Sequence, residues 1–153
     1  MKYIFYLLVV IGFAHFGLGQ NLAGFWRGAM VQNGYTIEKS VPFMLEISIQ
    51  GATVTGFSRD EIYNTESYAL KKLNGTAEEN KLTFKQTVIS KKTTSSKLNW
   101  CKMDADLTYN EKTGYLEGTY KSSDCRNISG KMILYRMDGK ISMDAKPSET
   151  HHW

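Results

Sequence analysis

Histidine, cysteine and proline are all scarce in this chain of 153 residues. The only histidines are His15, His151 and His152, so the long stretch between them lacks the commonest general base and metal ligand. A Ser-His-Asp arrangement or a histidine-based zinc site is hard to build from such a sequence. The adjacent His151 and His152 form a poor metal site by themselves. We therefore predict no metal, no cofactor and no enzymatic activity.

The charge is weak and dispersed, with 19 basic against 15 acidic residues. The lysine pairs Lys71-Lys72 and Lys91-Lys92 are not part of the dense basic stripe, interleaved with aromatic residues, that a nucleic-acid surface shows. We interpret them, like the acidic pair Asp60-Glu61, as solvated faces of strands. No glycine-rich loop leads from a strand into a helix, so a nucleotide site has no support either. The sequence predicts no nucleic-acid partner.

The first residues follow a different pattern from the rest of the chain. Lys2 supplies a positive charge, the stretch from Ile4 to Ala14 is apolar, and the small residues Gly17 and Gly19 come just before Gln20. This pattern predicts a secretory signal peptide over residues 1–19 that is cleaved after Gly19. The apolar run is too short to cross a bilayer, which takes about 20 residues, so we expect no transmembrane segment after cleavage.

The predicted signal peptide indicates where the protein is expected to be located and which residues are expected to fold. We predict a secreted or periplasmic protein with one folded domain over residues 20–137 and a flexible tail over residues 138–153. The composition, 42% hydrophobic and 22% charged, is sufficient for one buried core. Asn74-Gly75-Thr76 and Asn127-Ile128-Ser129 match the N-glycosylation pattern, which matters only where the source glycosylates exported proteins.

The folded part has a hydrophobic period of two, which predicts an all-β fold. In the stretch from Val41 to Gln50, for example, Phe43, Leu45, Ile47 and Ile49 share one face. Eight strands are predicted near Gly24 to Gln32, Val41 to Gln50, Thr53 to Glu61, Tyr68 to Gly75, Lys81 to Ser90, Trp100 to Tyr109, Tyr115 to Ser122 and Gly130 to Met137.

Most connections between these strands are short, as at Asn33-Gly34 and Gln50-Gly51. Short connections force sequential antiparallel pairing, because a parallel crossover needs a dozen or more residues. An eight-stranded antiparallel up-and-down barrel leaves no exposed edge, and a two-sheet β-sandwich is the alternative. Two longer connections, Asn64 to Ser67 and Ser90 to Lys97, are expected to flank an opening.

The two cysteines, Cys101 and Cys125, are expected to form a structural disulfide in an exported protein. They lie equally far from the turn between the sixth and seventh predicted strands. The register that places them opposite each other pairs Leu107 with Thr119, whereas pairing apolar residues with one another requires a shift of one. A bulge near Ser123-Asp124 would satisfy both demands.

The first and last predicted strands resemble those of a known family. Gly24-Phe25-Trp26 resembles the G-x-W motif that opens the first strand of lipocalins, which are calycin-type barrels. Arg136, on the last predicted strand, is similarly placed to the arginine that packs across that tryptophan and closes the barrel floor in lipocalins. The resemblance implies structural roles for Trp26 and Arg136 and an interior that holds a small hydrophobic ligand.

The period of two also identifies the residues expected to line such an interior. With eight strands, a barrel is just wide enough to be filled by side chains or to hold one small ligand. The sequence leaves open which of these applies. The predicted interior residues are Phe43, Leu45, Ile47, Phe57, Leu82 and Phe84.

Three functional hypotheses follow. The first is a non-enzymatic carrier of a small apolar molecule. The second is an extracellular module with a filled core that binds protein or glycan through Tyr63, Tyr68 and Tyr115. The third, which we consider the weakest, is a small hydrolase that uses Asp104 and Asp106; it requires both carboxyl groups to face a pocket.

Overall fold

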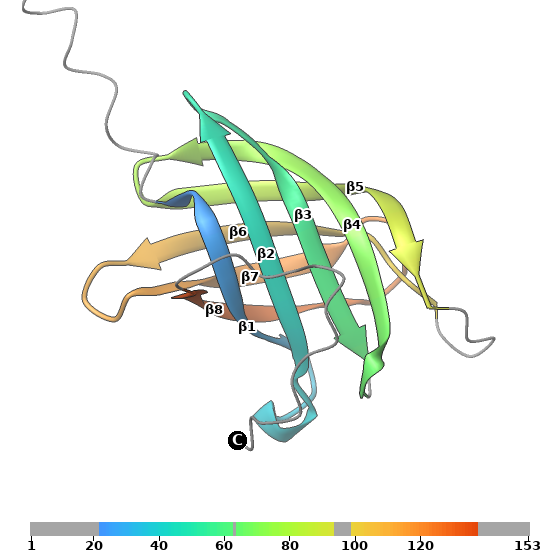
Figure 1. The fold of residues 1–153 in the computed structure, drawn as a ribbon. Coiled ribbons are helices and arrows are strands. Elements are labelled where there is room, and N and C mark those ends of the chain that lie inside the picture. The colour runs from blue at the N-terminus through green and yellow to red at the C-terminus, as the bar shows by residue number, and fades with distance from the viewer. Residues whose placement is uncertain (1–21, 63, 94–98, 138–153) are drawn as a thin grey trace, which may run out of the picture.

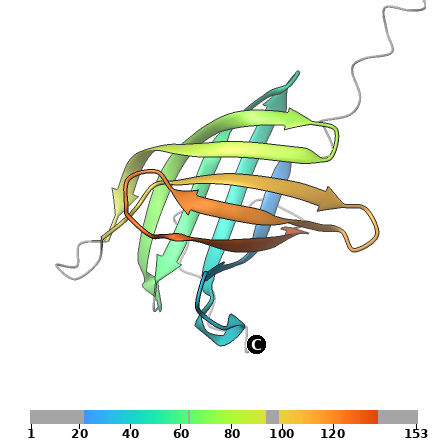
Figure 2. The same cartoon turned by 180° about the vertical axis from the view of Figure 1, so that it is seen from behind.

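A computed structural model describes residues 22–62, 64–93 and 99–137, which form a closed eight-stranded antiparallel up-and-down β-barrel (Figure 1). Each strand pairs with the next one in the sequence, and β1 pairs with β8 to close the barrel, so the barrel prediction is confirmed and the sandwich alternative is wrong. The view from behind shows β5 to β8 completing the wall (Figure 2). The strands are β1 (Gly24–Gln32), β2 (Val41–Gln50), β3 (Thr53–Ile62), β4 (Asn64–Glu78), β5 (Lys81–Lys92), β6 (Met103–Asn110), β7 (Tyr115–Ser122) and β8 (Ser129–Met137).

The connection between β1 and β2 contains a short 3₁₀ turn, η2 (Ile37–Lys39). None of its residues is buried. In the part of the chain that the structure describes, no helix has the length and apolar character to cross a membrane.

One predicted connection is a strand instead. Asn64 to Ser67 begins β4, because the pairing of β3 with β4 continues past Glu61–Tyr68 to Ile62–Asn64 through a register irregularity. The hairpin is therefore tighter than expected and does not form an open loop. The second expected connection starts later than predicted, since β5 extends to Lys92, and residues 94–97 lie outside the described residues.

The β6–β7 hairpin adopts the register that pairs apolar residues. Ala105 lies opposite Tyr120, and Tyr109 lies opposite Leu116. The shift of one residue, relative to a register that aligns the cysteines, is absorbed after β7 ends at Ser122. Cys101 and Cys125 form the predicted disulfide just outside the paired strands, with a Cα–Cα distance of 5.7 Å.

The barrel has one closed end, which is filled with apolar side chains. Trp26 is completely buried there, and its indole nitrogen donates a hydrogen bond to the carbonyl of Leu22 at 2.9 Å. The guanidinium of Arg136 lies over the Trp26 ring, with its Cζ 4.6 Å from the ring centroid, and donates to the carbonyl of Ala23 at 2.8 Å. Gly24 has a φ of +125°, a conformation that favours glycine. The glycine and the tryptophan of the G-x-W sequence therefore both have structural roles.

One residue predicted to be interior faces outward. Phe57 is 41% exposed, because it lies opposite Glu46 on the outer face of the β2–β3 hairpin. The tight turn after Gln50 places Ile49 opposite Val54 and Ile47 opposite Gly56, so the even-numbered residues of β3 point inward. The prediction for Phe57 was wrong because the turn determines which residues of the strand point inward, whatever their size.

Candidate functional site

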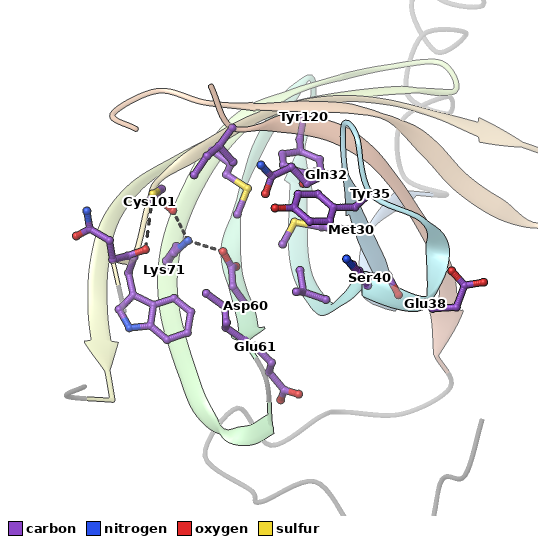
Figure 3. A pocket seen from close by; sticks show the side chains of 17 residues that line it. Met30, Gln32, Tyr35, Glu38, Ser40, Asp60, Glu61, Lys71, Cys101 and Tyr120 are labelled. Carbon is purple, nitrogen blue, oxygen red and sulfur yellow. Dashed lines mark hydrogen bonds and ion pairs between the residues drawn. The ribbon is translucent and has the colours of Figure 1, made fainter. Parts of the chain in front are cut away.

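A cavity of about 600 Å³ occupies the end of the barrel opposite the Trp26 floor (Figure 3). It lies where β1, β3 and β7 end and where β2 and β6 begin, beside the connection that carries η2. Its wall has an apolar part and a polar part. The apolar part consists of Met30, Tyr35, Val41, Ile62, Trp100, Cys101, Met103, Tyr120 and Ile128. Among the polar residues, Asp60, Glu61 and Lys71 are buried, and Gln32, Glu38, Lys39, Ser40 and Asn99 lie nearer the surface.

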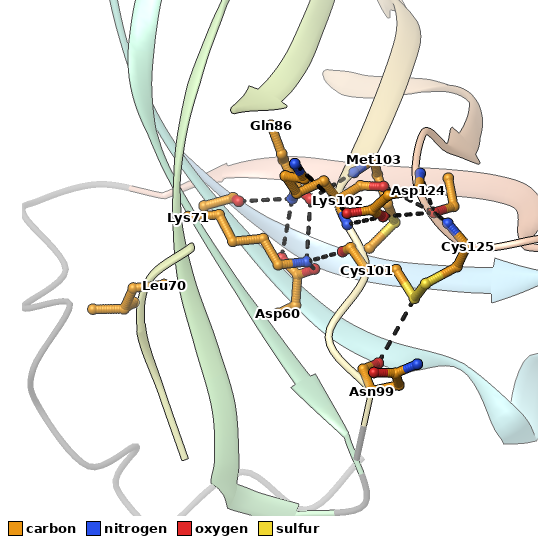
Figure 4. A network of polar contacts seen from close by, with 12 residues as sticks. Asp60, Leu70, Lys71, Gln86, Asn99, Cys101, Lys102, Met103, Asp124 and Cys125 are labelled. Atoms are coloured by element: carbon orange, nitrogen blue, oxygen red, sulfur yellow. Dashed lines mark hydrogen bonds and ion pairs between the residues drawn. A yellow bond between two sulfur atoms is a disulfide. The ribbon is translucent and has the colours of Figure 1, made fainter. Parts of the chain in front are cut away.

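The polar part of the wall is built around the completely buried ammonium of Lys71 on β4 (Figure 4). Lys71 Nζ donates to Asp60 Oδ2, to Gln86 Oε1 at 3.1 Å and to the main-chain carbonyl of Cys101. An ammonium group has three hydrogen-bond donors, so all the donors of Lys71 are used within the protein.

Gln86 on β5 completes this group of contacts. Its Nε2 donates to Ser58 Oγ at 2.8 Å and to Asp60 Oδ1 at 3.2 Å, while its Oε1 also accepts from the main-chain N–H of Met103 at 2.9 Å. We call Ser58, Asp60, Lys71, Gln86 and the Cys101 carbonyl the Lys71 network. The network joins β3, β4 and β5 to the start of β6, and its buried polar atoms are hydrogen-bonded to one another, which is the condition under which burying them is tolerated.

The environment of the network shifts two pKa values. Burial raises the pKa of the Asp60 carboxyl, and the Lys71 ammonium, together with hydrogen bonds from Gln86 and Ser58, opposes that rise. Burial, and after it the negative charge of Asp60, raises the pKa of the Tyr120 phenol. The Tyr120 hydroxyl therefore keeps its proton and is available as a hydrogen-bond donor at the cavity wall.

A second buried ion pair lies beside the first. Arg59 Nε donates to Glu61 Oε1 at 2.8 Å, and both side chains are almost completely buried. The Arg59 guanidinium also lies over the ring of Tyr68, 4.1 Å from its centroid. Opposite charges thus face each other in pairs at this end of the barrel.

Trp100 and Tyr120 each bring an aromatic ring with a hydrogen-bond donor to the cavity wall. The indole nitrogen of Trp100 is buried without a hydrogen bond. The Tyr120 hydroxyl likewise makes no hydrogen bond to another described residue. Unmet buried donors are uncommon in folded proteins, so the indole N–H of Trp100 singles out this end of the barrel as a place for a ligand or water.

The other residues predicted to line the interior lie deeper in the barrel than the cavity. Phe43, Leu45, Ile47, Leu82 and Phe84 are buried in the barrel core but do not line the cavity. The rings of Phe43 and Phe84 stack with centroids 6.4 Å apart. These side chains fill the middle and the closed end of the barrel and leave the open end unfilled.

The two carboxylates of the hydrolase hypothesis lie on the outside of the barrel. Asp106 is exposed and accepts a hydrogen bond from Thr83 Oγ1 at 3.1 Å, and Asp104 shares its outward face of β6. Both line a shallow outer depression and not the main cavity. The pair does not meet the condition that this hypothesis set.

The sequence analysis missed the network because it assigned charged residues to wet faces. Asp60 and Lys71 were interpreted as solvated, but both are buried inside the barrel. A signal was present: Asp60 continues the inward series of Val54, Gly56 and Ser58 at period two, and Gln86 follows Leu82 and Phe84 in the same way.

The contact between Trp26 and Arg136 lies at the closed end of the barrel. The cavity and the Lys71 network occupy the opposite end. Comparisons of this chain with protein-family models, with curated proteins and with solved structures found no match.

Proposed function

We propose that this is an exported, non-enzymatic binding protein that holds one small amphipathic molecule in the open end of its barrel. The observation that carries the proposal is the cavity of about 600 Å³ between β-strands. Ligand pockets have volumes of about 300–1,000 Å³ and are lined mainly by apolar groups with a few placed polar ones. The resemblance to lipocalins and the predicted signal peptide support the same function.

The composition of the wall favours an amphipathic molecule over a pure hydrocarbon. Met30, Val41 and Ile128 offer an apolar surface, while Tyr120 and the Lys71 network offer polar atoms. An apolar tail would gain from leaving water, by about 25 cal/mol for each Å² buried. A polar group on the same molecule would meet the hydrogen-bonding groups of the wall.

The alternative of a filled-core interaction module has less support. Tyr115 is exposed where β7 begins, at the closed end, whereas Tyr68 lies near the start of β4, at the open end, and packs against Arg59. Tyr63 lies outside the described residues. The described aromatic residues of this hypothesis thus form no contiguous patch.

Native mass spectrometry of the exported protein from its own source, followed by organic extraction, tests the proposal. We expect one small passenger per barrel. The variant Val41→Trp narrows the cavity and should lose the passenger, whereas Val88→Trp makes the same change on the exposed face of β5 and should keep it. A bare wild-type barrel, or equal loading of both variants, would count against the proposal.

A further inference from the structure

The charged groups around the cavity are already neutralised by one another. The carboxylate of Asp60 pairs with Lys71, and the carboxylate of Glu61 pairs with Arg59. Lys71 uses its three donors on Asp60, Gln86 and the Cys101 carbonyl. A ligand carboxylate entering here would therefore lose its water without gaining a free cationic donor from Lys71.

Such a carboxylate would also meet charges of its own sign. Asp60 and Glu61 both line the cavity, and Glu38 stands near its entrance. Like charges that approach in a poorly hydrated site repel one another strongly. Lys39, also near the entrance, is solvent-exposed, so water and salt screen its attraction for an anion.

An uncharged oxygen meets a more favourable wall. The Tyr120 hydroxyl lines the cavity and makes no hydrogen bond to another described residue, so it can donate to a ligand hydroxyl or carbonyl. The unpartnered indole N–H of Trp100 is a second donor in the same group of lining residues. Both features favour a molecule with an oxygen acceptor over one without.

We propose that the cavity selects an uncharged amphipathic molecule, with a hydroxyl or carbonyl at its polar end that bonds to Tyr120, and discriminates against the corresponding carboxylate. This inference rests on the proposed function, because it presumes that the cavity binds a ligand. It adds that the Asp60–Lys71 pair sets the charge preference: the carboxylate of Asp60 occupies the place that a ligand carboxylate would otherwise take beside Lys71.

The test is competition between decan-1-ol and decanoate, at neutral pH, for a site occupied by the uncharged fluorescent probe N-phenyl-1-naphthylamine. In the wild-type protein we expect decanol to bind at least about tenfold more tightly than decanoate, the ratio that one or two net hydrogen bonds produce. Decanoate binding as tightly as decanol, or more tightly, would overturn the inference. Failure of the probe itself to bind would instead count against the proposed function.

The variant Asp60→Asn tests the role of the ion pair. It removes the carboxylate and leaves the Lys71 ammonium without its counter-charge, so the preference should reverse in favour of decanoate. The double variant with Asp60→Asn and Lys71→Met removes both charges and should again prefer decanol. A preference that stays the same in all three proteins would refute the role assigned to Asp60.

The variant Tyr120→Phe provides a second test that does not disturb the buried charges. It keeps the ring and removes the hydroxyl, so decanol should bind about tenfold more weakly while decanoate changes little. Thermal unfolding followed by circular dichroism checks that each variant is folded. An unchanged affinity of folded Tyr120→Phe for decanol would contradict the proposed contact, even if the Asp60 variants did not fold.

Discussion

The two ends of this barrel are built from the same eight strands but from different kinds of side chain. At the closed end, Trp26, Val54, Leu82, Leu116 and Leu134 are completely buried and exclude water. At the open end, the same inward-facing series of β3, β4 and β5 continue with the polar residues of the Lys71 network around a cavity. The difference indicates that apolar packing at the closed end stabilises the barrel, while the open end keeps the cavity in which we propose that a ligand binds.

The largest effect on stability should come from replacing Trp26, at the closed end, and it should exceed the effect of replacing Trp100, at the open end. Trp26→Ala removes a buried ring that contacts Tyr109 and Arg136 and should lower the free energy of unfolding by about 3–5 kcal/mol. Trp100→Ala, at the cavity wall, should cost at least about 1 kcal/mol less, because the ring already borders a void and its nitrogen is unpaired. Urea unfolding measures both values, and equal losses would contradict the proposed division of roles.

The buried ion pair at the open end should behave as a unit. Lys71→Met alone leaves Asp60 buried without its partner and should destabilise the barrel by about 3–5 kcal/mol. Adding Asp60→Asn should recover most of that loss, since replacing both members of a buried pair is often close to neutral. A double-mutant cycle by urea unfolding measures the coupling, and simple additivity would show that the two groups do not depend on each other.

The disulfide should affect both stability and binding, because it cross-links the chain and lies beside the open end. Replacing Cys101 and Cys125 by serine should lower the free energy of unfolding by about 3.5 kcal/mol in the chain-entropy model. The carbonyl of Cys101 also accepts a hydrogen bond from Lys71, so probe binding should weaken as well. Loss of stability with unchanged probe affinity would separate the disulfide from the site.

The smallest effect concerns pH. The pKa of Asp60 is raised in the fold, so between the unfolded pKa of about 4 and the higher folded pKa the folded chain holds a proton that the unfolded chain has already released. The contribution of Asp60 to stability is therefore greatest at low pH and is lost as the pH rises through its folded pKa. Urea unfolding at several pH values should show this slope in the wild-type protein and not in the double variant with Asp60→Asn and Lys71→Met.

The closed end was largely predictable from the sequence, because its determinants are local and repetitive. A period of two gave the strands, and the G-x-W sequence with Arg136 gave the contact across the floor. The open end was not, because charged residues such as Asp60 and Lys71 are normally exposed and their pairing depends on how neighbouring strands align. Phe57 shows the same dependence, since the turn before β3 decides which of its faces is buried.

The size of the cavity could not be predicted for a related reason. The sequence predicts which faces of the strands are dry, but the free volume depends on how side chains from opposite strands meet. Phe43 and Phe84 meet in the middle of the barrel and fill that part of the interior. Toward the open end, the inward-facing residues leave about 600 Å³ unfilled.

The central claim is that the open end binds a small molecule, and titration with N-phenyl-1-naphthylamine tests it most directly. The wild-type protein and Val88→Trp should bind one probe molecule with the same affinity, because residue 88 faces solvent. Val41→Trp should abolish binding while the barrel remains folded, because residue 41 lines the cavity. Binding that survives Val41→Trp in the folded protein, or no binding by the wild type, would contradict the account.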